Sequence, residues 1–190
     1  MTSSKSMKQL ITLSFVLAII LSACVNDTKK SDINTTSNIN AKVKKDNKLY
    51  ANYTDNPTNQ NQIDENALID YAIEKGLDVK RTDSGIYYVV EEEGNGEVMV
   101  NGQPFQAHYS GYFLDGKVFD SSYQRGQPIA ATVGAMNAAW NEALQTFPVG
   151  SKLKLLIPSR MGYGARGFPG FVPPNTPLVF DMHILPIGKK

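Results

Sequence analysis

The sequence predicts an α+β fold in which an antiparallel sheet curves around one short helix. Three observations favour it. Several segments between residues 85 and 185 alternate apolar with other side chains, as strands with one buried face do. A single segment among them, residues 136–147, carries an apolar stripe at helical spacing. The pair Asp115-Gly116 indicates a tight hairpin between two strands. Strands that are each apolar on one face can bury that face against such a helix.

The N-terminus has the layout of a secretory signal peptide. Lys5 and Lys8 precede an apolar run over residues 10–21, which is short for a membrane-spanning helix. The small residues that follow, and then Cys24, resemble the lipobox of bacterial lipoproteins, in which the cysteine becomes the lipidated first residue. We therefore expect residues 1–23 to be a lipoprotein signal peptide and Cys24 to carry a lipid anchor. Two alternatives stay open: an uncleaved anchor, or cleavage elsewhere with Cys24 incidental.

A polar linker and a short helix are expected next. Residues 24–61 are rich in Asn, Thr, Lys, Asp and Ser, so they cannot bury enough apolar surface to offset ordering, and we expect a disordered tether. Residues 62–93 are expected to hold the helix, with Asp64 as its N-cap, and a leading strand over residues 85–90. We expect this helix either to pack on the folded domain or to precede the domain in the chain. Its apolar positions are Ile63, Ala67, Leu68, Tyr71 and Ala72.

The folded domain is expected to contain four further strands, near residues 103–113, 117–122, 151–158 and 178–185. Their alternation assigns the following side chains to the core: Phe105, Ala107, Tyr109, Leu153, Leu155, Ile157, Leu178, Phe180, Met182 and Ile184. The helix faces them with Met136, Ala139, Trp140, Ala143, Leu144 and Phe147. His108 and His183 fall on the opposite face, where we expect solvated side chains.

The composition excludes several functions. Lys and Arg number 19 against 18 Asp and Glu, so the chain lacks the basic excess of a nucleic-acid binder. Two separated histidines and one cysteine offer few ligands for a metal ion. The glycine-rich segment 94–102 lacks the Gly-Lys-Ser/Thr of a phosphate-binding loop. We therefore expect no nucleic-acid partner, no metal and no cofactor.

One loop has an unusual composition for a surface segment. Residues 162–177 are crowded with glycine, proline and aromatic side chains, directly before the closing strand. Surface loops are usually polar, so apolar side chains on one suggest that it covers something. We expect this loop to be a flap over an apolar pocket that receives a proline of another chain.

Three segments resemble the FKBP-type peptidyl-prolyl isomerases, in the same order and at near-family spacing: HYSGYFLDGKVFDSS, FPVGSKLKLLIPSRMGYGARG and VPPNTPLVFDMHIL. The N-terminal leader is similar, more loosely, to that of bacterial lipoproteins of this family. The resemblance implies a sheet of five or six strands around one helix, with the isomerase domain at residues 94–190. It also implies a pocket between helix and sheet, under two loops.

The resemblance assigns site residues by position. It implies a catalytic pocket made by Tyr109, Phe119, Asp120, Trp140, Tyr163 and Phe180. It implies substrate contacts by Ile129, Met136, Asn137, Phe168 and Val172, with Trp140 as the floor beneath the proline. Three positions depart from the family pattern: Ile129 replaces an aromatic residue, Asn137 lies in a shortened segment, and Phe168 replaces a polar or small residue. These departures bear on efficiency, on side-chain preference and on affinity for macrolide inhibitors.

The expected function is therefore peptidyl-prolyl cis–trans isomerisation in folding proteins of the bacterial cell envelope, on a membrane-anchored chain. An alternative is a non-catalytic proline-peptide binder or chaperone that uses the same pocket. A third is a structural lipoprotein whose aromatic residues are only core, since rings at strand and helix spacing are more often core than pocket.

Overall fold

The structure, a computed structural model, describes residues 48–187. Their main feature is an antiparallel sheet with the strand order β1-β2-β6-β7-β3-β4, in which β5 also pairs with β3. The strands are β1 (Lys80–Arg81), β2 (Tyr87–Glu92), β3 (Pro104–Tyr112), β4 (Val118–Ser121), β5 (Ile129–Thr132), β6 (Lys152–Ile157) and β7 (Leu178–Leu185). The α+β class is confirmed. The sheet has seven strands, where five or six were expected, because it includes two short strands, β1 and β5, of two and four residues.

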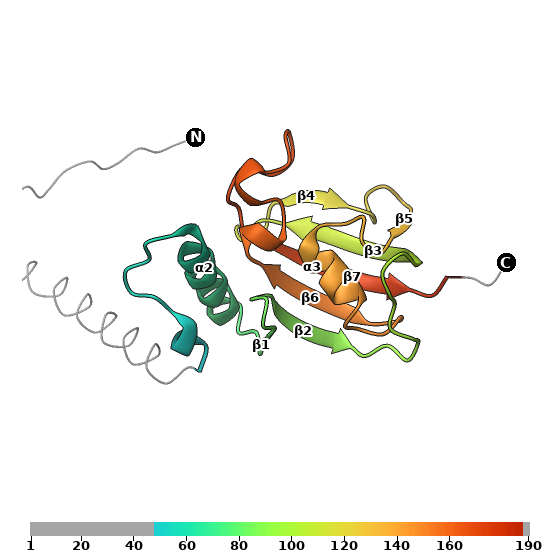
Figure 1. Cartoon of the computed structure of the whole chain (residues 1–190), viewed down its shortest axis with the longest axis horizontal. Coiled ribbons are helices and arrows are strands. Elements are labelled where there is room, and N and C mark those ends of the chain that lie inside the picture. The colour runs from blue at the N-terminus through green and yellow to red at the C-terminus, as the bar shows by residue number, and fades with distance from the viewer. Residues whose placement is uncertain (1–47, 188–190) are drawn as a thin grey trace, which may run out of the picture. The chain divides into compact units, whose positions relative to one another are not determined.

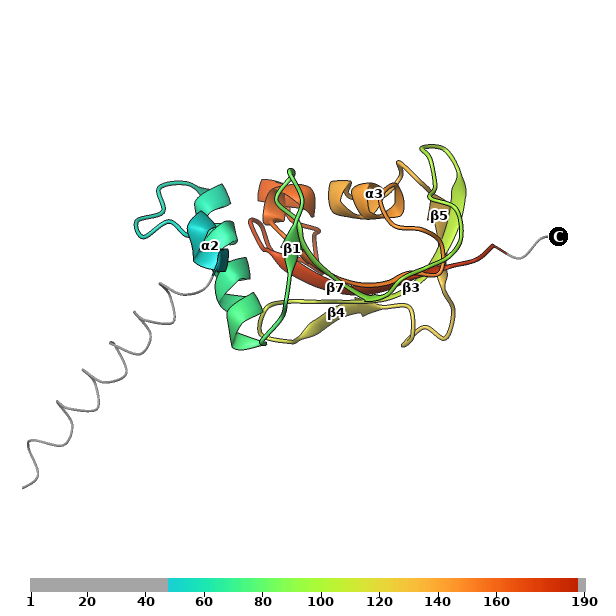
Figure 2. The same cartoon turned by 90° about the horizontal axis from the view of Figure 1, so that it is seen from below.

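The concave face of the sheet packs against helix α3 (Ala138–Leu144), which lies across it in Figure 2. The alternation predicted for β3, β6 and β7 is confirmed, since each residue assigned to the core from these strands is buried there. The helix is shorter than its apolar stripe because Asn137 caps it: the Asn137 side chain accepts a hydrogen bond from Trp140 N. Met136 therefore lies before the helix.

Helix α2 (Gln60–Glu74) packs against the other face of the same sheet. Tyr87, Leu156 and Val179 are cross-strand neighbours on β2, β6 and β7, and they point away from α3. They form a second apolar cluster with the buried helix residues Leu68, Ile69, Tyr71 and Ala72. Figures 1 and 2 show α2 at one end of the sheet, near β1. The helix therefore belongs to the domain.

Two expectations about this region are wrong. The N-cap is Asn59, whose side chain accepts from Gln62 N, whereas Asp64 lies inside the helix and is fully buried. Residues 48–61 are not a tether: they include the 3₁₀ helix η1 (Lys48–Asn52) and the start of α2. Leu49, Tyr50 and Tyr53 pack against the α2 cluster, which explains why this stretch is ordered. The signal peptide, Cys24 and the rest of the tether lie outside the described residues.

Between β6 and β7 the chain forms the flap loop, residues 158–177. It contains two 3₁₀ turns, η2 (Ser159–Met161) and η3 (Gly164–Arg166). Its tip is closed by two backbone hydrogen bonds of 2.8 Å between Phe168 and Val172. Within the described part of the chain, no helix is both long and apolar enough to span a bilayer.

The α2 cluster should contribute strongly to stability. Leu68 is 0% exposed, so Leu68→Ala should lower the free energy of unfolding by about 2–5 kcal/mol, through lost burial and the cavity left behind. Asp70→Ala, on the exposed side of the same helix, should change it by less than about 0.5 kcal/mol. Urea denaturation measures both. Equal effects of the two substitutions would show that α2 does not dock as described.

Candidate functional site

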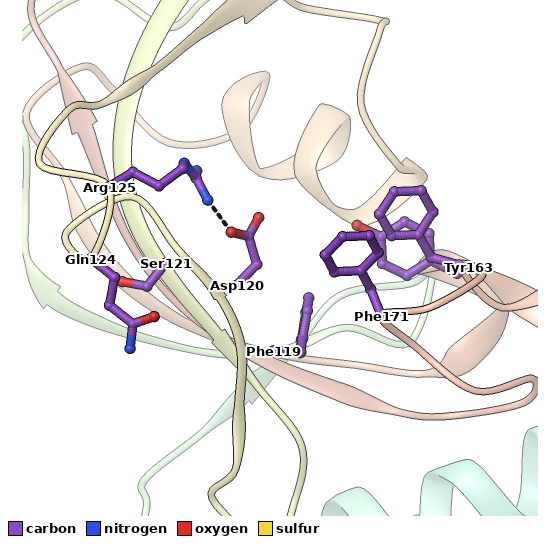
Figure 3. A pocket seen from close by; sticks show the side chains of 8 residues that line it. Phe119, Asp120, Ser121, Gln124, Arg125, Tyr163 and Phe171 are labelled. Carbon is purple, nitrogen blue, oxygen red and sulfur yellow. Dashed lines mark hydrogen bonds and ion pairs between the residues drawn. The ribbon is translucent and has the colours of Figure 1, made fainter.

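A cavity of about 470 Å³ opens between the flap loop and the segment that begins at β4. That volume falls within the range of small-ligand sites. Four predicted site residues line it: Phe119, Asp120, Tyr163 and Phe168. Four further lining residues were not predicted: Ser121, Gln124, Arg125 and Phe171. Figure 3 shows Arg125 and Asp120 on one side of the cavity and the rings of Tyr163 and Phe171 on the other.

The flap side of the cavity is a stack of three rings. Tyr163 and Phe168 have ring centroids 5.3 Å apart at 13°, and Phe168 and Phe171 have centroids 4.9 Å apart at 19°. Phe168 and Phe171 are 44% and 55% exposed, which is high for phenylalanine. The loop composition thus predicted the apolar character of the flap, and the stack gives this apolar surface a definite shape beside the cavity.

The opposite side carries a polar network. Arg125 pairs with the Asp120 carboxylate and donates from Nη2 to the Tyr109 hydroxyl at 2.8 Å. The same hydroxyl donates to Asp120, and the guanidinium lies 5.4 Å from the centroid of the Tyr109 ring. Arg125 is the only cation between Lys117 and Lys152, a signal that could have drawn attention to it. The network fixes Asp120 at the cavity wall.

Burial is the main influence on the Tyr109 hydroxyl. It raises the pKa of Tyr109 to about 12, and the hydrogen bond to Asp120 acts in the same direction, while Arg125 opposes both. Tyr109 is therefore a neutral hydroxyl at physiological pH, and its proton serves to hold Asp120.

Three predicted pocket rings lie beneath the cavity. Tyr109 and Trp140 pack edge to face with centroids 4.9 Å apart, as do Trp140 and Phe180 at 5.5 Å. None of the three is more than 5% exposed. Phe119 joins them to the cavity, since its ring meets Phe180 edge to face at 5.7 Å. The floor expected at Trp140 is therefore covered in this structure. The indole Nε1 is the one buried side-chain polar atom in residues 48–187 without a hydrogen-bond partner.

The remaining predicted residues surround the site without lining the cavity. Burial raises the pKa of Tyr163, and the Asn137 side chain acts in the opposite direction. Met136 and Ile129 are partly buried against the core, Ile129 from strand β5. Val172 is buried and pairs with Phe168 at the flap tip.

The two histidines lie side by side on the outer face. His108 and His183 are cross-strand partners on β3 and β7, and His108 Nδ1 lies 3.0 Å from the Ser122 hydroxyl. No group of three or more His, Cys, Asp and Glu side chains within residues 48–187 could hold a metal ion.

A sheet curved around one short helix, with an aromatic cavity under the loop before the last strand, defines a prolyl-isomerase-like domain. The family model described as FKBP-type peptidyl-prolyl cis-trans isomerase matches residues 96–185. A peptidyl-prolyl cis-trans isomerase of Schizosaccharomyces pombe is 40% identical over 109 residues, which cover 56% of this chain and 97% of that protein. The chain belongs to the FKBP-type peptidyl-prolyl cis-trans isomerase family.

Two bacterial proteins extend the comparison. A protein named probable FKBP-type peptidyl-prolyl cis-trans isomerase, from Haemophilus influenzae, is 39% identical over 61% of this chain and 48% of its own length. The chain thus spans about half the length of that curated relative. The crystal structure of FkpA from Escherichia coli aligns with a TM-score of 0.60 and 31% identity, over 85% of this chain and 73% of FkpA.

The polar network makes a prediction about ionisation. Arg125→Ala removes a cation that favours the phenolate, so the pKa of Tyr109 should rise further above about 12. Asp120→Asn removes an anion that disfavours the phenolate, so the same pKa should fall toward the ordinary value near 10. An NMR titration of ring-labelled tyrosine measures both shifts. If the two variants shift the pKa in the same direction, the network is not arranged as described.

Proposed function

We propose that the chain catalyses cis–trans isomerisation of X-Pro bonds in polypeptides, and that the cavity between Phe119 and Tyr163 receives the proline. The observation that carries this proposal is the cavity itself, apolar on the flap side and bordered by Asp120, in a chain of this family. The relatives compared above bear the name of this activity.

The chemistry requires no nucleophile or cofactor. Rotation about a peptide bond is opposed by about 18–20 kcal/mol, because resonance gives the C–N bond partial double-bond character. The planar amide is charge-separated, and twisting collapses much of that separation. An apolar cavity therefore destabilises the planar ground state more than the twisted transition state, which is differential binding in favour of rotation.

Each side chain then has a distinct part in the proposal. The Tyr163 hydroxyl, at the flap side of the cavity, donates to the carbonyl next to the rotating bond. Asp120, held by Arg125 and Tyr109, interacts with the carbon of the same carbonyl from the opposite wall, or orients Tyr109. Asn137 aligns the peptide backbone. Tyr109, Trp140 and Phe180 support the cavity from below, and direct contact of Trp140 with the proline requires the side chains above it to move.

Non-catalytic binding of proline peptides is the second candidate. The exposed rings of Phe168 and Phe171 would suit a chaperone that holds unfolded chains, and Ile129 departs from the family pattern. This candidate would be favoured if the chain assists the refolding of a protein but does not accelerate isomerisation of a short proline peptide. Competition by a macrolide inhibitor would show whether the pocket has kept the family's inhibitor affinity.

We further propose that the chain acts at the bacterial cell envelope. Residues 1–23 would be removed as a signal peptide, and Cys24 would carry palmitate or another acyl chain, leaving the isomerase domain on a tether. Two or more acyl chains hold a protein on a membrane durably, because each buried methylene contributes about 0.8 kcal/mol.

Cys24→Ser should abolish radioactive palmitate incorporation in growing bacteria. The chain contains one cysteine, so any label that persists in the variant cannot be thiol-linked and would refute the anchor.

The activity is tested by following an Ala-Leu-Pro-Phe peptide from cis to trans at low temperature. Tyr163→Phe removes one hydrogen bond to the carbonyl, about 0.5–1.5 kcal/mol, and should lower kcat/KM by about two- to tenfold. Asp120→Ala should lower it at least as much. Tyr123→Phe is the matched control, because Tyr123 is 57% exposed and does not line the cavity. If the Tyr163 and Asp120 variants lose activity only to the extent that they unfold, these two residues serve packing and not catalysis.

A further inference from the structure

A fully buried carboxylate lies outside the region that the family model matches. Asp64 is on α2, is 0% exposed, and takes no part in the proposed chemistry. Burying a carboxylate is costly unless it is hydrogen-bonded, so its partners indicate what it does. All of its hydrogen-bond partners in the described part of the chain lie on the flap loop or on the first turn of α2.

The first partner is the base of the flap loop. Asp64 Oδ2 accepts from Ser159 N at 2.7 Å and from Ser159 Oγ at 2.5 Å. Ser159 begins η2, and its carbonyl accepts from Gly162 N at 3.0 Å. Asp64 is therefore connected through Ser159 to the backbone N–H of Gly162, the residue before Tyr163.

The second partner leads to the other end of the loop. Gln60 Nε2 donates to Asp64 Oδ1 at 2.7 Å and to the Asn175 carbonyl at 3.4 Å. Asn175 N in turn donates to the Gly164 carbonyl at 2.9 Å. Asn175 is the one non-glycine residue with a left-handed backbone in residues 48–187, at φ 53°, a conformation that costs free energy and needs support.

Tyr163 is thus bracketed. Its two neighbours, Gly162 and Gly164, are hydrogen-bonded to Ser159 and Asn175, and both of those residues are held by the Asp64–Gln60 pair on α2. We propose that Asp64 is a positioning residue for the isomerase site: through both ends of the flap loop it sets where the Tyr163 hydroxyl lies over the cavity.

The inference rests on the proposed function and deepens it. The Tyr163 hydroxyl acts on a carbonyl whose charge changes as the bond twists, so its placement affects turnover. A displacement of about 1 Å in a positioned group can lower a rate by about a hundredfold. The base of the loop has a second support, since Arg160 Nη2 donates to the Ser84 carbonyl at 2.6 Å. Loss of Asp64 should therefore loosen the loop without detaching it.

Asp64→Asn keeps the size of the side chain but turns an amide donor toward Ser159 or Gln60. It should lower kcat/KM for the proline peptide by about two- to tenfold, since misplacing the Tyr163 hydroxyl costs no more than removing its hydrogen bond. Glu65→Gln is the matched control. Glu65 is the next residue of α2 and accepts from Tyr87 and Arg81, away from the flap, so it should affect stability but leave kcat/KM within about twofold.

A double-mutant cycle separates positioning from general packing. If Asp64 acts through Tyr163, then Asp64→Asn should lower kcat/KM much less in a Tyr163→Phe background than in the wild-type chain, because the group that it positions has gone. Equal losses in both backgrounds would overturn the proposal. Every variant must unfold at a temperature well above that of the assay. If Asp64→Asn fails to fold, Gln60→Ala replaces it in the cycle, because it breaks the link from the start of α2 to Asn175.

Amide hydrogen exchange gives a readout independent of turnover. Asp64→Asn should accelerate exchange at Ser159, Gly162 and Asn175, while the Phe180 amide in the central strand keeps its protection. If those three amides exchange as in the wild type, Asp64 does not hold the loop. If the wild-type chain does not isomerise the peptide at all, the proposed function fails, whatever the exchange shows.

Discussion

Edge-to-face packing between α3 and the concave face of the sheet is the contact on which the rest of the structure depends. Trp140 meets Tyr109 and Phe180 at nearly right angles, and Phe180 meets Phe119 in the same way. Such pairs contribute about 0.5–1.5 kcal/mol each beyond their burial, and their geometry is specific. They fix α3, and with it Asn137. Because they also fill the space beneath the cavity, the cavity walls come from β4 with the loop that follows it and from the flap loop, and each wall has supports of its own.

Those supports differ in kind. The wall at Asp120 is held by Arg125 from the following loop, a short-range contact within one segment. The wall at Tyr163 is held from α2, more than ninety residues earlier in the chain, through the contacts of Asp64 with Ser159. The helix also packs on Tyr87, Leu156 and Val179 of the outer face of the sheet, so one element both adds to the core and supports the site.

Periodicity predicted the elements with one uniformly apolar face, and it failed where the face is mixed. Strands β3, β6 and β7 alternate clearly, so their core residues followed from the sequence. Helix α2 buries Asp64 and Asn66 beside Leu68. A pattern built on the spacing of apolar residues therefore underestimates how much of this helix face is buried. Strands β1 and β5 are too short to show a period. Arg125 and Phe171 lie in loops, where no period exists, so their place in the cavity depends on the folded chain.

The flap loop combines two types of contact that suit the proposed reaction. Its base is held by short, directional hydrogen bonds, which tolerate little displacement. Its tip carries the stacked rings of Phe168 and Phe171, whose apolar contacts are non-directional and can form again around different side chains. Isomerisation in unrelated polypeptides requires one hydroxyl in a constant place and a binding surface without strict preference. A loop that is hydrogen-bonded at its base and carries stacked apolar rings at its tip suits both requirements with a single segment of chain.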